Sequence, residues 1–148
     1  MKKLLLYYST LIYLVSFLIT AFGLFFSNDK FSAFFLFFFS SINLLALFFI
    51  FKSNYVQVSY YSLSLLFFLQ SFTFLFFGIS YKFVIGPNIS LYLINYEFDV
   101  TSFTFMFYNL VFHVNKIENI DHSLFGINFI QLILCLLFFS FAVKERSK

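Results

Sequence analysis

The chain has 148 residues, of which 62% are hydrophobic and only 10% are charged, and its mean hydropathy is +0.96. A soluble domain carries about 25% charged residues, so the composition excludes an ordinary soluble protein and indicates one domain that faces lipid. The net charge of +3 comes from basic residues scattered along the chain. Because they form no patch, the sequence argues against binding to nucleic acid.

The hydrophobic stretches predict the fold. A membrane-crossing helix needs about 20 apolar residues, and the connections between such stretches are short, which favours antiparallel neighbours. We therefore expect an all-α membrane protein with about five transmembrane helices and a short interfacial hairpin between the third and the fourth. The expected spans are 4–26, 31–51, 58–80, 100–117 and 124–143, with the interfacial segment at 81–99.

The first apolar stretch has two interpretations. Lys2 and Lys3 followed by an apolar run could form a signal peptide, with small residues near Ala21 to Gly23. The run from Leu4 to Phe26 is long enough to cross a bilayer. We expect a retained first span.

The segment 81–99 breaks the helical pattern. Gly86, Pro87 and Asn88 form a strong turn signal, and apolar and polar residues alternate in "INYEFDV" at 94–100, which is the period of a strand. We expect 82–85 to pair with this run as an interfacial hairpin, because open hairpin backbone is not satisfied in lipid. The alternative is a sixth span, which would place more basic residues on one side of the membrane.

Polar side chains inside the expected spans are amides and hydroxyls rather than charged groups. They could line a hydrated path or contact a quinone, or they could form hydrogen bonds between helices, which we expect. Because ion pathways need ionisable groups in the membrane, the chain is not expected to act as a pump by itself. These residues are Ser40, Ser41, Asn43, Gln70, Ser71, Thr73, Asn109, Asn128 and Gln131.

The residues that could bind a metal or perform acid–base chemistry match no known spacing. His113 and His122 lie nine residues apart, near Glu118 and Asp121, without a cysteine partner. They suit interfacial positions better than haem or metal ligation. Glu97 and Asp99 stand without a nucleophile and are expected to mark a boundary with water. The single Cys135 excludes an intramolecular disulfide and is expected to pack as a small hydrophobe. We therefore expect no catalytic, cofactor-binding or metal-binding residue and no cofactor.

The amino-acid usage indicates the type of genome. The chain contains 30 Phe and 10 Tyr but only 4 Gly and 1 Pro, although lipid contact does not favour Phe over Leu or Val. Such usage is typical of AT-rich codons, as found in organelle genomes and in reduced bacterial genomes. Mitochondria are the preferred source, because their genomes encode chiefly hydrophobic membrane subunits.

One stretch resembles a known family. In "SLYLINYEFDVTSFTFMFYNLVFHV", the residues Phe98-Asp99-Val100-Thr101-Ser102 precede an expected helix. This step is similar to one in the antiporter-like subunits of NADH dehydrogenase, respiratory complex I. The chain is much shorter than those subunits and lacks their intramembrane lysines and glutamate. The resemblance therefore implies a small divergent subunit beside the pumps and transfers no functional residue.

The expected function is that of a non-catalytic structural subunit of a mitochondrial inner-membrane respiratory complex, first of all the membrane arm of NADH:ubiquinone oxidoreductase. Expected partners are other hydrophobic subunits and lipids such as cardiolipin, and the expected location is the inner membrane, as a multi-pass protein. Cytochrome oxidase, the quinol-oxidising complex, ATP synthase and the succinate dehydrogenase anchor are alternative hosts. A small transporter or channel component of an AT-rich bacterium is the alternative of another class.

Overall fold

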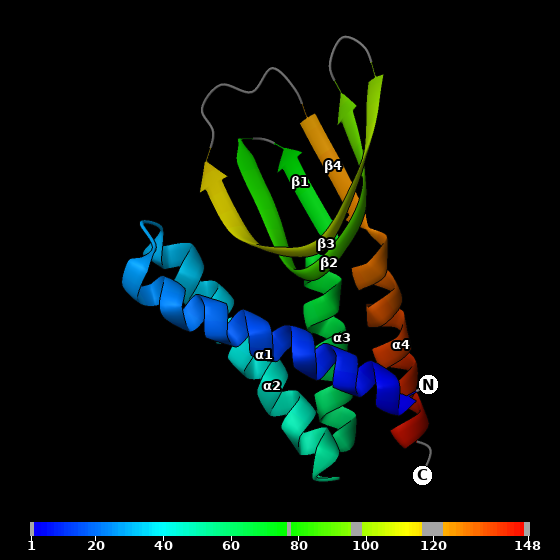
Figure 1. The fold of residues 1–148 in the computed structure, drawn as a ribbon. Helices are drawn as coiled ribbons and strands as arrows, with labels where there is room; N and C mark the ends of the chain where they lie inside the picture. The colour runs from blue at the N-terminus through cyan, green and yellow to red at the C-terminus, as the bar shows by residue number, and fades with distance from the viewer. Residues whose placement is uncertain (1, 77, 96–98, 117–122, 147–148) are drawn as a thin grey trace.

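The structure, a computed structural model, describes residues 2–76, 78–95, 99–116 and 123–146. Within these residues it contains four helices at one end and a four-stranded antiparallel sheet at the other (Figure 1). The expected all-α membrane fold is therefore wrong, and the fold is α+β. The elements are α1 Lys2–Phe26, α2 Lys30–Phe51, α3 Val56–Gln70, β1 Phe72–Phe76, β2 Ile79–Asn95, β3 Asp99–Lys116, β4 Ser123–Asn128 and α4 Phe129–Arg146.

Helices α1 and α2 form an antiparallel hairpin over the first two expected spans. The turn between them ends at Asp29, whose carboxylate accepts a hydrogen bond from the backbone N–H of Ser32 at 3.0 Å and caps α2. Among the described residues, α1 and α2 are the two helices long and apolar enough to cross a membrane. Only 28% and 33% of their most apolar stretches are buried, so most of their surface lies outside the protein core.

Helix α3 is shorter than expected. The chain enters it through Ser53 and Tyr55, which have positive φ angles of 56° and 48°, and the helix ends at Gln70. Beyond Ser71 the backbone passes directly into β1, so the expected helix over 58–80 is wrong in its last third. The hydrogen bonds that a helix would supply there come instead from pairing of β1 with β2 and β4.

Strands β2 and β3 replace the expected interfacial segment and the expected fourth helix. They pair antiparallel from Ile79↔Lys116 to Asn95↔Asp99. The expected strand character is confirmed for the described residues of 94–100, which belong to the end of β2 and the start of β3. The expected pairing of this run with 82–85 is wrong, because 82–85 pairs with 110–113. The alternative of a sixth helical span at 81–99 is also wrong.

The expected turn at Gly86-Pro87-Asn88 is instead a bulge in the β2–β3 ladder. Gly86 pairs with Asn109 and Asn88 pairs with Met106, so β3 has two residues opposite Pro87. Pro87 has no N–H to donate to the ladder, and Gly86 has a φ of +103° that side chains rarely adopt. The turn-forming residues therefore interrupt the pairing without reversing the chain.

The last expected span is also divided. Residues 123–128 form β4 and the helix α4 begins only at Phe129. The side chain of Asn128 accepts a hydrogen bond from the N–H of Gln131 at 3.5 Å, as a cap does at the start of a helix. An expected helix over 124–143 is therefore confirmed from 129 onward only.

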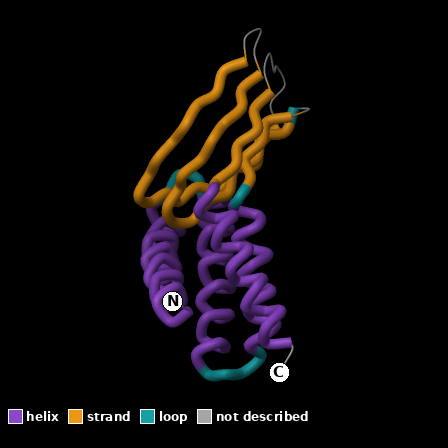
Figure 2. Tube along the Cα trace, turned by 90° about the vertical axis from the view of Figure 1, so that its right-hand side faces the viewer, coloured by secondary structure: helices purple, strands orange, loops and turns teal. Residues whose placement is uncertain are grey.

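The sheet has the order β1-β4-β2-β3, with an additional pairing between β1 and β2. The additional pairing is possible because β2 is long: its start pairs with β1 around Lys82, and its end pairs with β4 around Tyr92. Gly126 of β4 lies under the ring of Tyr92, where a Cβ would lie 2.5 Å from a ring carbon. Figure 2 shows the strands rising from one end of the helices.

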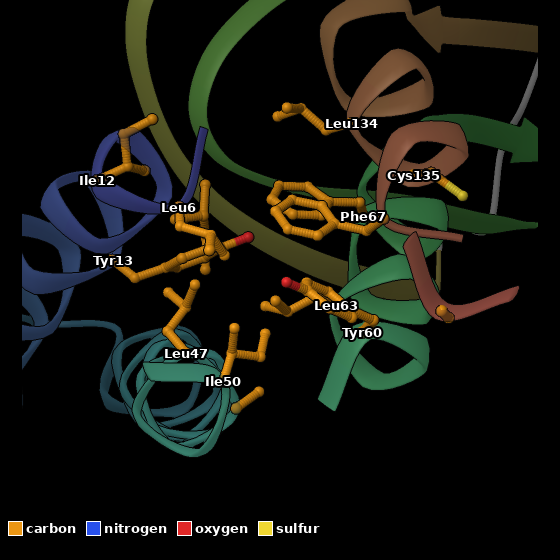
Figure 3. Packing of buried hydrophobic residues seen from close by; sticks show 14 of the residues in the cluster. Leu6, Ile12, Tyr13, Leu47, Ile50, Tyr60, Leu63, Phe67, Leu134 and Cys135 are labelled. Carbon is orange, nitrogen blue, oxygen red and sulfur yellow. The ribbon is translucent and has the colours of Figure 1, made fainter. Parts of the chain in front are cut away.

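The hydrophobic core lies among the four helices, where α1 crosses α3 (Figures 1 and 3). The ring of Phe67 stacks on that of Phe138 with their centroids 5.3 Å apart, and Tyr13 packs against Phe67. Lys2 and Glu145 form a salt bridge of 2.9 Å that joins the start of α1 to the end of α4. Cys135 is buried in this core, as expected for a small hydrophobe.

Candidate functional site

A group of four buried amides lies where the helices meet the sheet. Gln70 ends α3, Asn128 precedes α4, Gln131 lies in the first turn of α4, and Asn88 follows the bulge in β2. All four side chains are at most 3% exposed. We call these four residues the amide junction.

Gln70 fixes the sheet to two helices. Its Oε1 accepts a hydrogen bond from the backbone N–H of Ile85 at 2.9 Å, and its Nε2 donates to the hydroxyl of Tyr13 at 3.2 Å. Ile85 belongs to β2 and Tyr13 to α1. One side chain thus connects α3, β2 and α1.

Gln131 and Asn128 satisfy the backbone at the bulge. The Nε2 of Gln131 donates to the carbonyls of Ile85 and Pro87 at 3.1 and 3.3 Å. The Oδ1 of Asn128 accepts from the N–H of Ile89 at 3.4 Å. These backbone groups lie in the part of β2 between Lys82, where its pairing with β1 ends, and Ser90, where its pairing with β4 begins. The amides therefore replace hydrogen bonds that regular strand pairing would have supplied.

Three atoms of the junction have no hydrogen-bond partner among the described residues: Nδ2 of Asn88, Nδ2 of Asn128 and Oε1 of Gln131. Amide groups do not titrate, so the junction can orient and stabilise but cannot transfer protons as an acid or base. The interpretation of Gln70, Asn128 and Gln131 as hydrogen-bonding groups is supported. Their bonds, however, run mainly from helix to strand rather than between helices.

The remaining polar residues of the expected spans are also placed. Ser41 and Asn43 donate to carbonyls of their own helix, both at 2.8 Å, and Ser71 does the same at 2.8 Å. Ser40 is fully buried in α2. Asn109 pairs with Gly86 on the sheet, and Thr73 pairs with Lys82 and Gly126.

A cleft of about 480 Å³ opens between the α1–α2 turn and strands β2 and β3. Ser27, Asp29 and Ser32 line it from the turn, and Lys82 and His113 line it from the strands. Its remaining lining is mainly apolar and comes from α1, α2 and β3: Ile19, Thr20, Gly23, Ala33, Leu36, Leu110, Val111 and Phe112. We call this site the turn cleft. It combines charged groups with an apolar wall, as an amphipathic ligand requires.

Electrostatics in the turn cleft favour the ionised form of Asp29. Hydrogen bonds from the side chain and backbone of Ser32, aided by the charge of His113, hold the pKa of Asp29 below its usual value. Lys82 and His113 are directly paired across β2 and β3, so their side chains start from the same face of the sheet. An acidic and two basic side chains thus meet at one cleft.

The residues considered for metal or acid–base chemistry are not brought together. His113 is exposed on β3, and His122, Glu97, Glu118 and Asp121 lie outside the described residues. Asp99 pairs with Asn95 beside the hairpin tip. In the ranges that the structure describes, no three His, Cys, Asp or Glu residues are grouped as metal ligands.

Sequence reasoning missed three components of these sites. Tyr13 lies inside the first expected span and was given no role, yet it is fully buried and bonded to Gln70. Asn88 was assigned to a turn, and Lys82 to a membrane edge. The polar residues at 82, 88 and 90, which alternate with apolar ones, were the available signal that one face of this segment is polar.

Comparisons with protein-family models, with curated proteins and with solved structures find no match to this chain.

Proposed function

We propose that the chain is a non-catalytic membrane subunit that braces a larger assembly. The observation that carries this proposal is the apolar exterior of the molecule: large apolar side chains are exposed on both the helices and the sheet, while uncharged polar side chains such as Ser16, Gln70 and Asn88 are buried beside the apolar core. Water-soluble proteins expose fewer large apolar groups and bury fewer polar ones. Such a surface is stable only against lipid or other apolar protein.

The helices clearly combine buried polar side chains with exposed apolar ones. On α1, Ser9, Ser16 and Thr20 are buried while Phe22 and Phe25 are exposed. Small polar residues in contact surfaces are typical of membrane helices, because they let helices approach closely. At about 1.5 Å per residue, α1 and α2 measure roughly 37 and 33 Å, enough to cross a bilayer core of about 30 Å.

The sheet repeats the same arrangement. A row of directly paired apolar side chains crosses all four strands on one face: Phe72, Ile127, Leu91 and Phe103. The neighbouring row, on the other face, contains Thr73, Gly126, Tyr92 and Ser102. Lys82 lies over the ring of Tyr92 at 5.8 Å, on this second face. The polar face is thus turned inward, and we call Phe72, Ile127, Leu91 and Phe103 the outer row.

A structural role follows from what the interior contains. The buried amides are used to hold the bulge and the helix ends, and no Asp, Glu, Lys, Arg or His is among the buried residues of the described structure. Cavity-lining groups of a transporter would instead face an open path. The alternative of a small channel component therefore receives no support from the amide junction.

We propose the mitochondrial inner membrane as the location and the membrane arm of NADH:ubiquinone oxidoreductase as the host. This part of the proposal rests on the AT-rich residue usage, with 30 Phe in 148 residues. The resemblance at 98–102 gives it no support, because the segment that follows is the strand β3 and not a membrane helix. Partners would be neighbouring hydrophobic subunits that cover the exposed apolar surface. No nucleic acid is expected among them.

A phospholipid such as cardiolipin is the lipid partner that we propose for the turn cleft. Lys82 and His113 would contact a phosphate, and the wall formed by Ile19, Leu36 and Leu110 would contact an acyl chain. Paired basic groups beside apolar helices suit an anionic headgroup.

Blue-native electrophoresis of mildly solubilised membranes tests the function. We expect the chain to comigrate with a respiratory assembly and to stay in the pellet after alkaline carbonate extraction. Migration as a free small species would contradict the subunit role. Release by carbonate would contradict membrane insertion itself.

Lipid binding at the turn cleft is tested separately by native mass spectrometry of the purified chain with added cardiolipin. Lys82→Gln should reduce cardiolipin binding several-fold. The control is Lys52→Gln, which removes a lysine that lies over the ring of Phe48 outside the cleft. Equal binding by both variants would contradict the site.

A further inference from the structure

Strand β3 forms an open edge of the sheet. Among the described strands it pairs only with β2, and its other side has no strand beside it. Half of its backbone N–H and C=O groups therefore point away from the sheet. Figure 1 shows β2 and β3 as two long strands that run side by side.

Before its bulge, this edge lacks the usual protection against pairing with another chain. Native edge strands carry Lys, Pro, inward charges or bulges, or they are covered by other elements. From Ser102 to Phe112, β3 contains no charged residue and no proline. The bulge at Phe107 and Tyr108 is the only interruption in the described β2–β3 ladder.

The free part of the edge lies before the bulge. Tyr108 bonds to Ser16 of α1 at 2.7 Å, and Phe112 stacks on Phe35 of α2 at 4.9 Å. These contacts hold the second half of β3 against the helices. The first half makes no such contact in the described structure, and Phe103 and Phe105 there are 65% and 54% exposed.

We propose that 102–106 of β3 pairs antiparallel with the same segment of a second copy of this chain. A two-fold axis at Thr104 would place Phe103 of each copy directly opposite Phe105 of the other. Directly opposite aromatic residues are favourable cross-strand pairs, and the uncharged segment creates no repulsion between copies. A two-fold contact is also closed, so the pairing ends at a dimer rather than a fibre.

The inference goes beyond the proposed function and stands apart from it. In lipid, unpaired edge groups have no water to bind and need another strand. In water, the unpaired N–H and C=O groups of an unprotected edge also serve as a template for pairing with a strand of another chain. A second copy satisfies the edge in either setting.

Cysteine cross-linking in intact membranes tests the pairing. In a Cys135→Ala background, Thr104→Cys should form a disulfide dimer on mild oxidation, because directly opposite Cβ atoms lie about 4.5–5.5 Å apart. Leu91→Cys is the matched control: it lies on the same sheet but one strand inside, about 14 Å from its counterpart across three strand spacings. The control should stay monomeric.

Charge exchange provides a second test that does not depend on disulfide geometry. F103K/F105K and F103E/F105E should each abolish the Thr104→Cys dimer, because like charges then face one another. Coexpression of the two variants should restore a mixed dimer, which also shows that both fold.

A monomer with Thr104→Cys alone would overturn the inference, as would equal cross-linking of Leu91→Cys or a dimer that survives either double substitution. Cross-linking to a different protein would show that the edge docks a foreign strand and would overturn the second copy. Retention in carbonate-washed membranes with no dimer would leave the proposed function intact.

Discussion

The α1–α2 hairpin and the β2–β3 hairpin are built from similar residues but differ in structure. Both are rich in Phe, both are nearly uncharged, and both expose apolar side chains. They differ in the spacing of their polar residues. In α1 the buried Ser9, Ser16 and Thr20 recur at helical spacing, whereas in the sheet Asn88 with Ser90 and Ser102 with Thr104 recur every second residue.

This comparison shows which residues indicate the buried face of a helix or a strand in a protein with an apolar exterior. In a water-soluble protein the apolar residues mark the buried face, and their period predicts the element. Here apolar residues occupy both faces, so their period is uninformative. The sparse polar residues mark the buried face in both hairpins.

Gly126 of the sheet and Gly23 of the helical hairpin should respond oppositely to substitution. Gly126→Val should destabilise the sheet by about 1–3 kcal/mol or more, because its Cβ would lie 2.5 Å from the ring of Tyr92. Gly23→Ala in the helical hairpin should be neutral or stabilising, because its Cβ would lie 3.7 Å from that of Ala33. Denaturant titration in mild detergent, followed by far-ultraviolet circular dichroism, measures both. Equal losses in the two variants would contradict the packing of Gly126.

Removal of one side-chain amide from the amide junction should weaken the connection between the helices and the sheet. Gln70→Leu leaves the buried N–H of Ile85 and the hydroxyl of Tyr13 without their partner, at a cost of about 1–3 kcal/mol. Gln57→Leu, at the half-exposed start of the same helix, should cost much less. Hydrogen exchange should show faster exchange of the β2 amides near Ile85 in the first variant. Unchanged exchange there would contradict the role of Gln70.

Tyr81 should make the sheet sensitive to alkali. It donates a hydrogen bond to the carbonyl of Leu69 at 2.8 Å, and burial raises its pKa to about 12. Since the folded pKa lies above the unfolded value of 10, the stability it contributes is complete below pH 10 and is lost as pH rises toward 12. Tyr81→Phe should cost less than about 1 kcal/mol at neutral pH and should remove this part of the alkaline loss. A wild-type and a variant curve that stay parallel from neutral pH to pH 12 would contradict the assignment.

Asp29 should give the smallest effect, confined to the helical hairpin. Its pKa is lowered by hydrogen bonds from Ser32, so its stabilising contribution is present above the unfolded value of 3.8 and disappears as pH falls through the folded value. Asp29→Asn keeps a capping group without titration and should flatten the acidic end of the stability curve. The difference below pH 4 between the stability curves of the wild type and of the variant measures the contribution of the Asp29 carboxylate. Identical acid dependence would contradict capping by the carboxylate.

The sequence predicted part of the candidate sites. Gln70, Asn128 and Gln131 were recognisable as hydrogen-bonding groups because amides without charge in an apolar setting require partners. Their partners were not recognisable, since Ile85 and Pro87 reach them only through the fold. The turn cleft was not recognisable either. Lys82, His113 and Asp29 line it only because the fold brings their strands and turn together, and no local pattern specifies that arrangement.

The sequence by itself determined the apolar exterior, the two long helices at 2–26 and 30–51, and the absence of charge in their centres. Length and uninterrupted hydrophobicity suffice for these properties, because a helix satisfies its backbone within one segment. Only the tertiary structure decided that 72–76, 79–95, 99–116 and 123–128 are strands. Strand backbone is satisfied by distant segments, as where Phe72 pairs with Ile127, and an apolar run suits either a helix or a ladder until those partners are present.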